Sequence, residues 1–225
     1  MSEPVRLLVV DDDPLVRAGL SSMLSGAPEL ELVGVAADGQ EAVDAVRDLR
    51  PDVVLMDIGM PVLDGVAATE AIRRRTAAPD VVMLTTFGSD EDLLRALRAG
   101  ASGYLLKDAA PAEIVAAVLK VAAGESVLSP QATRQLMDHV GAVDQDSRRT
   151  TACAALAQLT ERERDVMLAV AEGMSNAEVA TALDVGIATV KTHLTNSLAK
   201  LQLTNRVQLA LLAHDAGLTN QSGGV

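Results

Sequence analysis

Within the first 123 residues, short apolar runs alternate five times with amphipathic segments, and this alternation restricts the fold more than any other feature. The apolar runs predict strands at about 5–10, 31–36, 52–56, 80–84 and 102–106. Helical patterns follow them at about 14–25, 39–49, 65–75, 89–98 and 111–123. Strands and helices in strict alternation predict an α/β fold, here a flavodoxin-like, doubly wound, five-stranded parallel sheet with helices on both faces.

Beyond residue 124 the strand pattern ends, so we place a first domain at 1–124. Residues 125–155 are interpreted as a linker with one weak helix at about 130–140 and a polar stretch at 141–151. Residues 156–219 predict a small all-α domain, and 220–225 a disordered tail. Helical periodicity in the all-α domain covers about 160–172, 175–182, 187–200 and 204–215.

Composition excludes several classes of protein. One Phe, one Tyr and no Trp argue against a base-stacking binder of single-stranded nucleic acid. A single cysteine, Cys153, excludes an internal disulfide and a cysteine-based zinc site. No apolar run reaches the length of a membrane span and no signal peptide is recognised, so a cytoplasmic protein is expected. The net charge of −12 is concentrated in residues 1–125, where 11 Lys and Arg face 21 Asp and Glu.

Polar residues stand at the carboxyl ends of four predicted strands. Ligands bind at this edge of an open parallel sheet, near the switch in strand order. Crowded carboxylates resist joint ionisation, and Mg²⁺ relieves that conflict while it also binds phosphate oxygens. The strand-end residues are Asp11 to Asp13, Asp57, Thr85 and Lys107.

Such a pocket is equipped to hold a phosphoryl group, with Asp57 as the nucleophile that becomes an acyl phosphate. Each residue alone has a structural explanation. Asp11 to Asp13 before Pro14 also suit a turn and helix cap, Thr85 an ordinary strand end, and Lys107 a solvated charge. Their joint occurrence at four strand ends favours the phosphoryl pocket.

The segments "LLVVDDDPLVR", "PDVVLMDIGMPVLDG", "VVMLTTF" and "GASGYLLKDA" resemble the receiver domain of bacterial two-component response regulators. The resemblance covers residues 5–123. It implies that Asp57 is the phosphoacceptor. It also implies an Mg²⁺ site and a switch, with these residues: Asp12 as a direct ligand, Asp11 mainly through water, the Gly59 carbonyl, and Thr85, Tyr104 and Lys107 around the phosphoryl group. Gly59 departs from common versions because it offers no side chain beside the pocket.

The segment 175–201 predicts a helix-turn-helix. Ser175 with Glu178 three residues later forms a capping box, a glycine-containing turn occupies 184–186, and a second helix starts near Ile187. On a helical wheel, the inward stripe of the second helix is apolar. Its outer face carries small and hydrogen-bonding side chains suited to a major groove, namely Ala188, Thr189, Thr192, Thr195, Asn196 and Ala199, with Lys191 and His193 on the flanks. A solvated face of a small bundle is the alternative interpretation.

Charge is the weak point of a DNA-binding interpretation, because residues 156–225 hold 5 Lys and Arg against 7 Asp and Glu. The cations available for phosphates are Lys191, Lys200, Arg206, Arg162 and Arg164. Even so, residues 159–218 resemble a LuxR-type DNA-binding domain along their whole length, through "LTERERDV" and "SNAEVA…TVKTHL…KL". The residues expected to contact DNA are Ser175, Thr189, Lys191, Thr192, Thr195 and Asn196. Family proteins often have Ser, Lys or Arg where Thr195 and Asn196 stand, so the resemblance does not give the base preference.

The last predicted helix carries apolar residues at helical spacing. The resemblance implies that Val207, Leu211 and His214, with Ala210, pair two DNA-binding domains, whereas closure of the four-helix core is the alternative.

Together the two resemblances identify the NarL/FixJ type of response regulator, which is not an enzyme. The implied partners are a cognate sensor histidine kinase, double-stranded DNA with paired half-sites, a second copy of the chain on activation and RNA polymerase. Three alternatives fit less well. The first, a receiver that has lost phosphorylation, is disfavoured because every pocket residue is present. An aspartyl-phosphate hydrolase would have an Asp-x-Asp motif after the strand, whereas here Gly59 stands two residues after Asp57. A ligand-controlled DNA-binding sensor tends to have an aromatic pocket, which this chain lacks.

Overall fold

The computed structural model describes residues 3–75, 77–86, 90–128 and 145–218. They fall into two compact units that divide between 139 and 140, and each unit is described by itself. Within the described ranges, no helix is long and apolar enough to cross a membrane.

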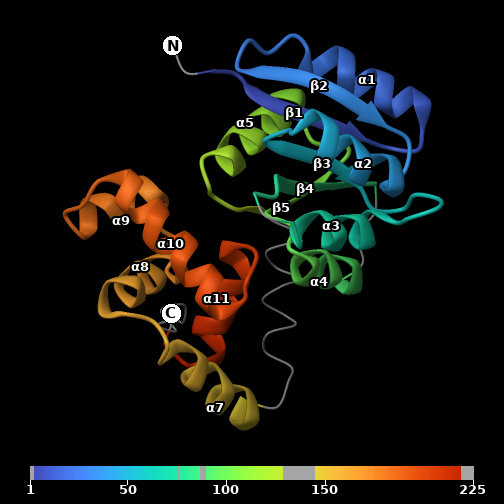
Figure 1. Ribbon diagram of the computed structural model, residues 1–225. Helices are drawn as coiled ribbons and strands as arrows, with labels where there is room; N and C mark the ends of the chain where they lie inside the picture. The colour runs from blue at the N-terminus through green and yellow to red at the C-terminus, as the bar shows by residue number, and fades with distance from the viewer. Residues whose placement is uncertain (1–2, 76, 87–89, 129–144, 219–225) are drawn as a thin grey trace, which may run out of the picture. The chain divides into compact units, whose positions relative to one another are not determined.

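The first unit is built on a parallel sheet in the order β2-β1-β3-β4-β5-β6 (Figure 1). The five predicted strands are confirmed within one or two residues. These strands are rich in Val, Leu and Met, because helices cover both faces of a parallel sheet and its side chains are therefore buried on both sides. The strands are β1 (Val5–Val10), β2 (Leu30–Ala36), β3 (Val53–Asp57), β4 (Asp80–Thr85), β5 (Gly103–Leu106) and β6 (Val127–Leu128).

The sixth strand corrects the predicted five-stranded sheet. It has two residues, Val127 and Leu128, which pair with Gly103 and Tyr104 of β5. Two residues are too few to show the alternation of apolar and polar residues that indicates a strand, so the sequence predicts them as part of the linker. The turn before them contains Gly124 with a positive φ of 85°, which redirects the chain from the preceding helix to the edge of the sheet.

Five helices cover the two faces of this sheet. Helices α1 and α5 pack together on one face, whereas α2, α3 and α4 follow one another on the other face (Figure 1). Aspartates cap three of them with side-chain hydrogen bonds to first-turn amides, as the sequence favours. The helices are α1 (Pro14–Leu24), α2 (Gly39–Leu49), α3 (Gly65–Arg73), α4 (Asp90–Ala99) and α5 (Pro111–Ala122).

Strand β1 lies between β2 and β3, so the direction of winding changes at the β1–β3 pair. The connections from these two strands therefore diverge to opposite faces and leave a crevice at their carboxyl ends. This crevice is where Asp11 and Asp57 stand.

The second unit is all-α, and its four predicted helices are confirmed. They pack around an aliphatic core that includes Val166, Met167, Val179, Val190 and Leu209. The helices of the unit are α7 (Gln145–Leu156), α8 (Glu161–Ala171), α9 (Asn176–Ala182), α10 (Ile187–Leu201) and α11 (Arg206–Asp215).

Helix α7 corrects the interpretation of the polar linker over residues 145–151, whereas 141–144 lie outside the described residues. Ala152 and Leu156, four residues apart, are both buried in the same core as α8 and α11. Two apolar residues at the end of a polar helix give too weak a pattern to predict it, because packing supplies most of its stability. The weak helix expected at 130–140 lies outside the described residues.

Candidate functional site

Asp11 and Asp57 form the floor of the crevice. Asp57 is the last residue of β3 and Asp11 directly follows β1, and their exposed fractions are 7% and 1%. The Lys107 ammonium joins them, with its Nζ 2.6 Å from Asp11 Oδ2 and 3.1 Å from Asp57 Oδ2. The backbone amide of Lys107 donates to the Thr85 carbonyl at 2.7 Å, which ties the loop after β5 to β4.

Burial dominates the electrostatics of this pocket. It raises the pKa of Asp57, and the hydrogen bond and charge of Lys107 offset that effect only in part. For Lys107, burial lowers the pKa, but hydrogen bonds to Asp11 and Asp57 outweigh burial and raise it overall. The ammonium therefore stays charged at neutral pH between two carboxylates, and the pocket carries an excess of negative charge.

The three acidic residues fit a divalent cation. One carboxylate oxygen each from Asp11, Asp12 and Asp57 lies within 4.8 Å of the others. Oxygen ligands of Mg²⁺ stand about 2.0–2.1 Å from the ion, so two of them are at most about 4.2 Å apart. Oxygens that lie within 4.8 Å of one another are close to that range. Asp12 is exposed, which leaves the site open to water and to a phosphoryl group.

The loop from β3 to α3 passes very close to the phosphoacceptor position. The Gly65 amide donates to the Ile58 carbonyl at 2.9 Å. A Cβ at Gly65 would stand 1.8 Å from the Asp57 carbonyl oxygen, so only glycine fits. This glycine ends one of the motifs quoted above, but its role was not predicted, because no local pattern distinguishes it from a helix-start glycine.

Thr85 and Tyr104 are both inside the first unit. Thr85 is 5% exposed at the end of β4. The Tyr104 ring on β5 is 1% exposed, and its hydroxyl has no hydrogen-bond partner among the described residues. Burial, with a smaller effect of the Asp92 charge, raises the pKa of Tyr104 to about 12. A buried hydroxyl without a partner costs free energy. A rearrangement of the pocket that moves this side chain to a hydrogen-bond partner would therefore be favourable.

Helices α9 and α10 form the predicted helix-turn-helix. The capping box is confirmed, because Glu178 Oε2 accepts from the Ser175 amide at 2.7 Å and Ser175 Oγ accepts from the Glu178 amide at 3.3 Å. Asp184 in the turn has a left-handed φ of 52°, and Gly186 precedes the first residue of α10.

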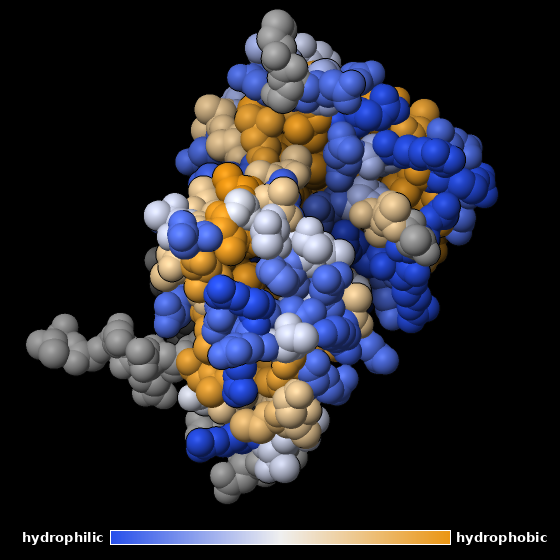
Figure 2. Space-filling view, turned by 60° about the vertical axis from the view of Figure 1, so that its left-hand side comes forward, coloured by the Kyte–Doolittle hydropathy of each residue, from blue (hydrophilic) through white to orange (hydrophobic). Residues whose placement is uncertain are grey.

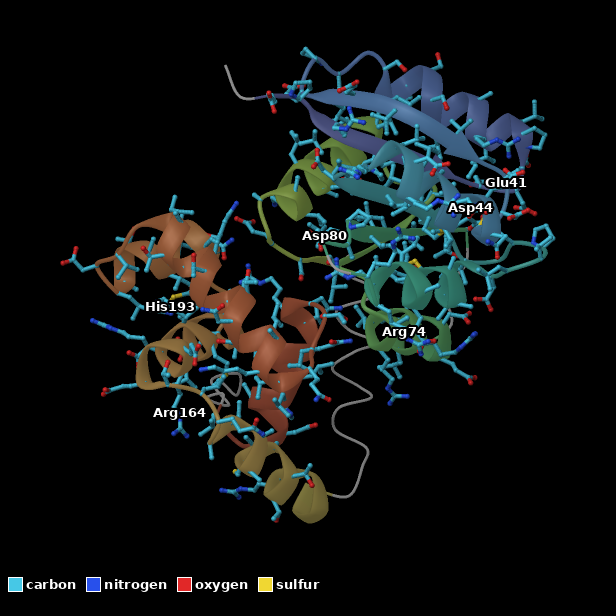
Figure 3. The ribbon with its side chains drawn as sticks, in the orientation of Figure 1. Glu41, Asp44, Arg74, Asp80, Arg164 and His193 are labelled. Atoms are coloured by element: carbon cyan, nitrogen blue, oxygen red, sulfur yellow. The ribbon has the colours of Figure 1, made fainter. Side chains whose placement is uncertain are left out.

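The outer face of α10 is exposed, as the helical wheel predicts. Val190, Leu194 and Ser197 are buried on the opposite side. His193 is half-buried on the flank, and Figure 3 labels it on α10. The exposed residues are Ala188, Thr189, Lys191, Thr192, Thr195, Asn196 and Ala199.

Three of the five cations considered for phosphate contacts have a partner within the unit, and the pair of Arg162 Nη1 with Asp165 Oδ2 at 3.7 Å is the longest of these contacts. Arg206 Nη2 donates to the Met174 carbonyl at 2.5 Å, immediately before the N-cap of α9. Lys200 Nζ lies 2.7 Å from Glu163 Oε2. Lys191, Arg162 and Arg164 are exposed and have no buried partner, and Arg164 is labelled on α8 in Figure 3, whereas Lys200 is exposed but pairs with the buried Glu163. Contacts between residues 37 or 32 positions apart have no local signal in a sequence.

Glu163 is the buried end of one of these pairs. Its side chain is 5% exposed and also accepts from the Thr160 amide at 2.8 Å. The hydrogen bond from Lys200, followed by that from Thr160, lowers the pKa of Glu163 to about 2. Because the folded pKa lies below the ordinary value, the stabilisation is present above about pH 4.5 and is lost as the pH falls towards 2.

We therefore expect Glu163→Gln to destabilise the second unit at pH 7 by about 1–2 kcal/mol, which is typical of a lost hydrogen bond to a charged group. The difference from the parent should shrink between pH 5 and pH 3. Hydrogen exchange of α8 and α10 amides, measured by mass spectrometry, reports on this unit alone. Glu161→Gln, an exposed change in the same helical turn, should have little effect, and a pH-independent loss would contradict the assignment to charge.

The residues of α11 that were considered for dimerisation differ in how far they are buried. Val207 is buried, which favours the core alternative for that residue. Leu211 and His214 are half-buried, as is Ala210. Leu209 and Ala213, which the sequence pattern did not single out, are the fully buried core residues of this helix.

Comparison with family models assigns both units. Residues 7–119 match the response regulator receiver domain. Residues 157–213 match the bacterial regulatory proteins of the luxR family. The acidic crevice lies in the first match and the helix-turn-helix in the second.

Known relatives share this arrangement over nearly their whole length. The nitrate/nitrite response regulator protein NarL of Escherichia coli strain K12 is 35% identical over 212 residues, which cover 94% of this chain and 96% of NarL. The response regulator protein VraR of Staphylococcus aureus is 39% identical over 214 residues, covering 95% and 98%.

Solved structures agree. The response regulator ChrA of a heme-sensing two-component system matches with a TM-score of 0.53 and 34% identity, covering 96% of this chain and 100% of ChrA. The receiver domain of a NarL from Mycobacterium tuberculosis matches with a TM-score of 0.54 and 38% identity, covering 55% of this chain and 100% of that domain.

The fold and the two sites define a two-component response regulator with a receiver and a LuxR-type DNA-binding domain. The chain belongs to the NarL/LuxR family of such regulators, which are transcription regulators and not enzymes. Receiver domains bind Mg²⁺ through acidic residues, and this one has the acidic cluster to do so. A receiver implies a histidine kinase as partner, and a LuxR-type domain implies DNA.

Proposed function

We propose that Asp57 accepts a phosphoryl group from a sensor histidine kinase and that this modification controls sequence-specific DNA binding. The observation that carries the proposal is the Lys107 ammonium within 3.1 Å of both buried carboxylates at the crevice. A fixed cation beside a buried carboxylate is ready to receive the oxygens of a phosphoryl group.

In this proposal an Asp57 carboxylate oxygen attacks phosphorus, and the bond from phosphorus to the kinase histidine breaks as the acyl phosphate forms. Asp11, Asp12, Asp57 and the Gly59 backbone carbonyl would hold Mg²⁺, which would supply positive charge beside the phosphoryl oxygens. Lys107 exchanges part of its contact with Asp57 for a phosphoryl oxygen and keeps its contact with Asp11.

Phosphorylation of Asp57 also shifts the equilibrium between two conformations of the receiver. Thr85 at the end of β4 donates its hydroxyl to the phosphoryl group, and Tyr104 moves with it. The unpartnered Tyr104 hydroxyl supports this role, because a group without a hydrogen bond gains from a new arrangement. The receiver then shifts between two populations, and the DNA-binding unit follows.

On the DNA side, the exposed face of α10 enters the major groove. Thr189, Lys191, Thr192, Thr195 and Asn196 are assigned to bases and phosphates, and Ser175 and the N-terminus of α9 to the backbone. Paired half-sites are the expected target, bound by two copies of the chain. Leu211 and His214 of α11 are the residues assigned to contact between the two DNA-binding units.

The proposed function is tested by incubating the full chain with a small-molecule phosphodonor and Mg²⁺. Intact mass spectrometry should find one added phosphoryl group, and the label should be removed by alkali, as an acyl phosphate is. Chelation of Mg²⁺ should prevent the labelling. Stable labelling at several sites, or labelling independent of Mg²⁺, would contradict the proposal.

DNA affinity should depend only moderately on salt. Three solvent-facing cations per chain, at about −0.9 per neutralised phosphate, give a slope of log affinity against log salt between about −3 and −6 for a dimer. Lys191→Ala should reduce the slope by roughly one unit per chain, whereas Arg206→Gln should lower affinity without changing the slope. A slope near −10 would mean that other surfaces contact the DNA.

A further inference from the structure

The bases that α10 can read depend on the side chains that it exposes. Its sequence, IATVKTHLTNSLAKL, contains no arginine, glutamine, aspartate or glutamate. The commonest specific contact with a base is a bidentate pair from Arg or Lys to guanine O6 and N7. Of the two lysines of α10, Lys200 pairs with the buried Glu163, which leaves Lys191. The rest of this face has to recognise bases through other groups.

Thr192 stands near the middle of α10, and its hydroxyl is already engaged. The side chain is exposed, and its Oγ1 donates to the Ala188 carbonyl, one turn earlier, at 2.9 Å. A threonine hydroxyl carries one hydrogen, so Thr192 has none to donate to a base while this bond is present. The bond also draws Oγ1 towards the helix backbone. The Cγ2 methyl is therefore the part of Thr192 that projects towards a partner.

A projecting methyl has one specific complement in the major groove. Thymine carries its C5-methyl group at that edge, and contact with a threonine or alanine methyl buries apolar surface on both sides. Ala188, exposed one turn before Thr192, adds a second methyl to the same surface. In the space-filling view, residues of intermediate hydropathy reach the surface between hydrophilic and hydrophobic ones (Figure 2). Threonine is such a residue, and in Thr192 the hydrogen bond within the helix leaves the apolar part for contact.

Asn196 supplies the donor and acceptor pair that Thr192 lacks. It is exposed on α10, one turn after Thr192. An asparagine amide is bidentate to adenine N6 and N7. Residues four apart in a helix stand about 6 Å apart along its axis, and base pairs follow one another at about 3.4 Å. Thr192 and Asn196 can therefore face base pairs that are one or two steps apart.

We propose that Thr192 recognises the methyl group of a thymine in each half-site and that Asn196 recognises an adenine within two base pairs of it. The inference rests on the proposed function, because it names the bases that the same face contacts. Lys191 is then left for a phosphate, as the salt dependence expected above requires. The half-site accordingly has A·T pairs where it faces the middle of α10.

The test uses the full chain with phosphodonor and Mg²⁺, and a duplex selected from a random library. Each thymine of the selected duplex is replaced in turn by uracil, which removes the methyl group and leaves the hydrogen-bonding groups unchanged. Fluorescence anisotropy then measures the dissociation constant of each duplex. Uracil at one position in each half-site should weaken binding about three- to fivefold, the loss expected for one buried methyl group.

Two substitutions of Thr192 separate the methyl from the hydroxyl. Thr192→Ser keeps the hydroxyl but lacks the methyl, so it should bind the thymine and uracil duplexes equally well. Thr192→Val keeps the methyl and should retain the difference between them. Thr181 is the matched control, because it is exposed on α9 and its Oγ1 donates to the Ala177 carbonyl at 3.0 Å. Thr181→Ser should discriminate against uracil as the parent does.

Asn196→Ala tests the second contact. Selection repeated with this variant should recover the same thymine but no preference for adenine one or two base pairs away, because alanine cannot form the bidentate pair. An unchanged preference for adenine would show that another side chain recognises it.

Three results would overturn the thymine contact. The selected duplex could tolerate uracil at every thymine, or Thr192→Ser could discriminate against uracil as well as the parent. If Thr192→Val loses affinity and Thr192→Ser keeps it, Thr192 Oγ1 accepts from a cytosine or adenine amino group instead.

The same measurements separate this inference from the proposed function. A duplex that is selected equally well without phosphodonor, and that still depends on its thymine methyl through Thr192, contradicts only the control by phosphorylation. A duplex whose selection needs phosphodonor but which tolerates uracil contradicts only the inference. A library in which no sequence is enriched contradicts both.

Discussion

Asp57→Asn is expected to abolish labelling by a phosphodonor completely while the protein stays folded. Asparagine has nearly the same volume, but its amide is not a nucleophile for phosphorus. Lys107 keeps its contact with Asp11 at 2.6 Å, so the pocket retains one of its two ion pairs. Intact mass spectrometry measures the labelling, and circular dichroism measures the fold.

The stability of this variant has a predictable sign. Burial raises the folded pKa of Asp57 above its ordinary value. Such a group stabilises the fold when protonated, below its unfolded pKa, and this contribution is lost as the pH rises through the folded pKa. At neutral pH, in the absence of Mg²⁺, the Asp57 charge therefore costs stability. We expect Asp57→Asn to be at least as stable as the parent in urea unfolding.

Asp12→Asn is the matched comparison, since it removes one carboxylate from the same pocket. It should leave the nucleophile intact but require more Mg²⁺ for the same labelling rate. If Asp57→Asn is labelled as well as the parent, the phosphoacceptor is another residue. If all three proteins respond to Mg²⁺ alike, the cation binds elsewhere.

The topology of the first unit was predictable because its signals are local and repeated. Most of the strands are rich in Val, Leu or Met. Their ends place Asp11, Asp57 and Lys107 at one edge once the sheet is known to be parallel. The helix-turn-helix was predictable for the same reason, since the Ser175 capping box is local to the start of α9 and the helical spacing of buried residues is local to α10.

Features that depend on distant contacts were not predictable. Val127 and Leu128 become a strand only because β5 has a free edge, and α7 is a helix because Ala152 and Leu156 find the core of the second unit. The sequence predicts that Arg206 is available for DNA phosphates. In the structure its guanidinium donates to the Met174 carbonyl, and no side-chain pattern reveals a backbone partner of this kind.

Gly65 is the residue for which a small change should have the largest effect on stability. It is the first residue of α3, where Gly→Ala ordinarily stabilises a helix by up to about 1 kcal/mol. Here the new Cβ would stand 1.8 Å from the Asp57 carbonyl oxygen and 3.0 Å from Met56 Cγ. Backbone in the buried end of β3 has to move, so we expect a destabilisation of about 3 kcal/mol or more.

Two other glycines provide controls with the same substitution. Gly19→Ala in α1 and Gly59→Ala in the loop after β3 place the new Cβ where no atom lies within 4 Å. The first should be neutral or stabilising in thermal unfolding and the second close to neutral, and both should accept a phosphoryl group. Gly65→Ala should lose labelling together with stability, because the shift displaces Asp57 relative to Lys107. A Gly65→Ala protein as stable as Gly19→Ala would mean that the loop after β3 relaxes freely, and the close approach would then not explain why glycine is needed there.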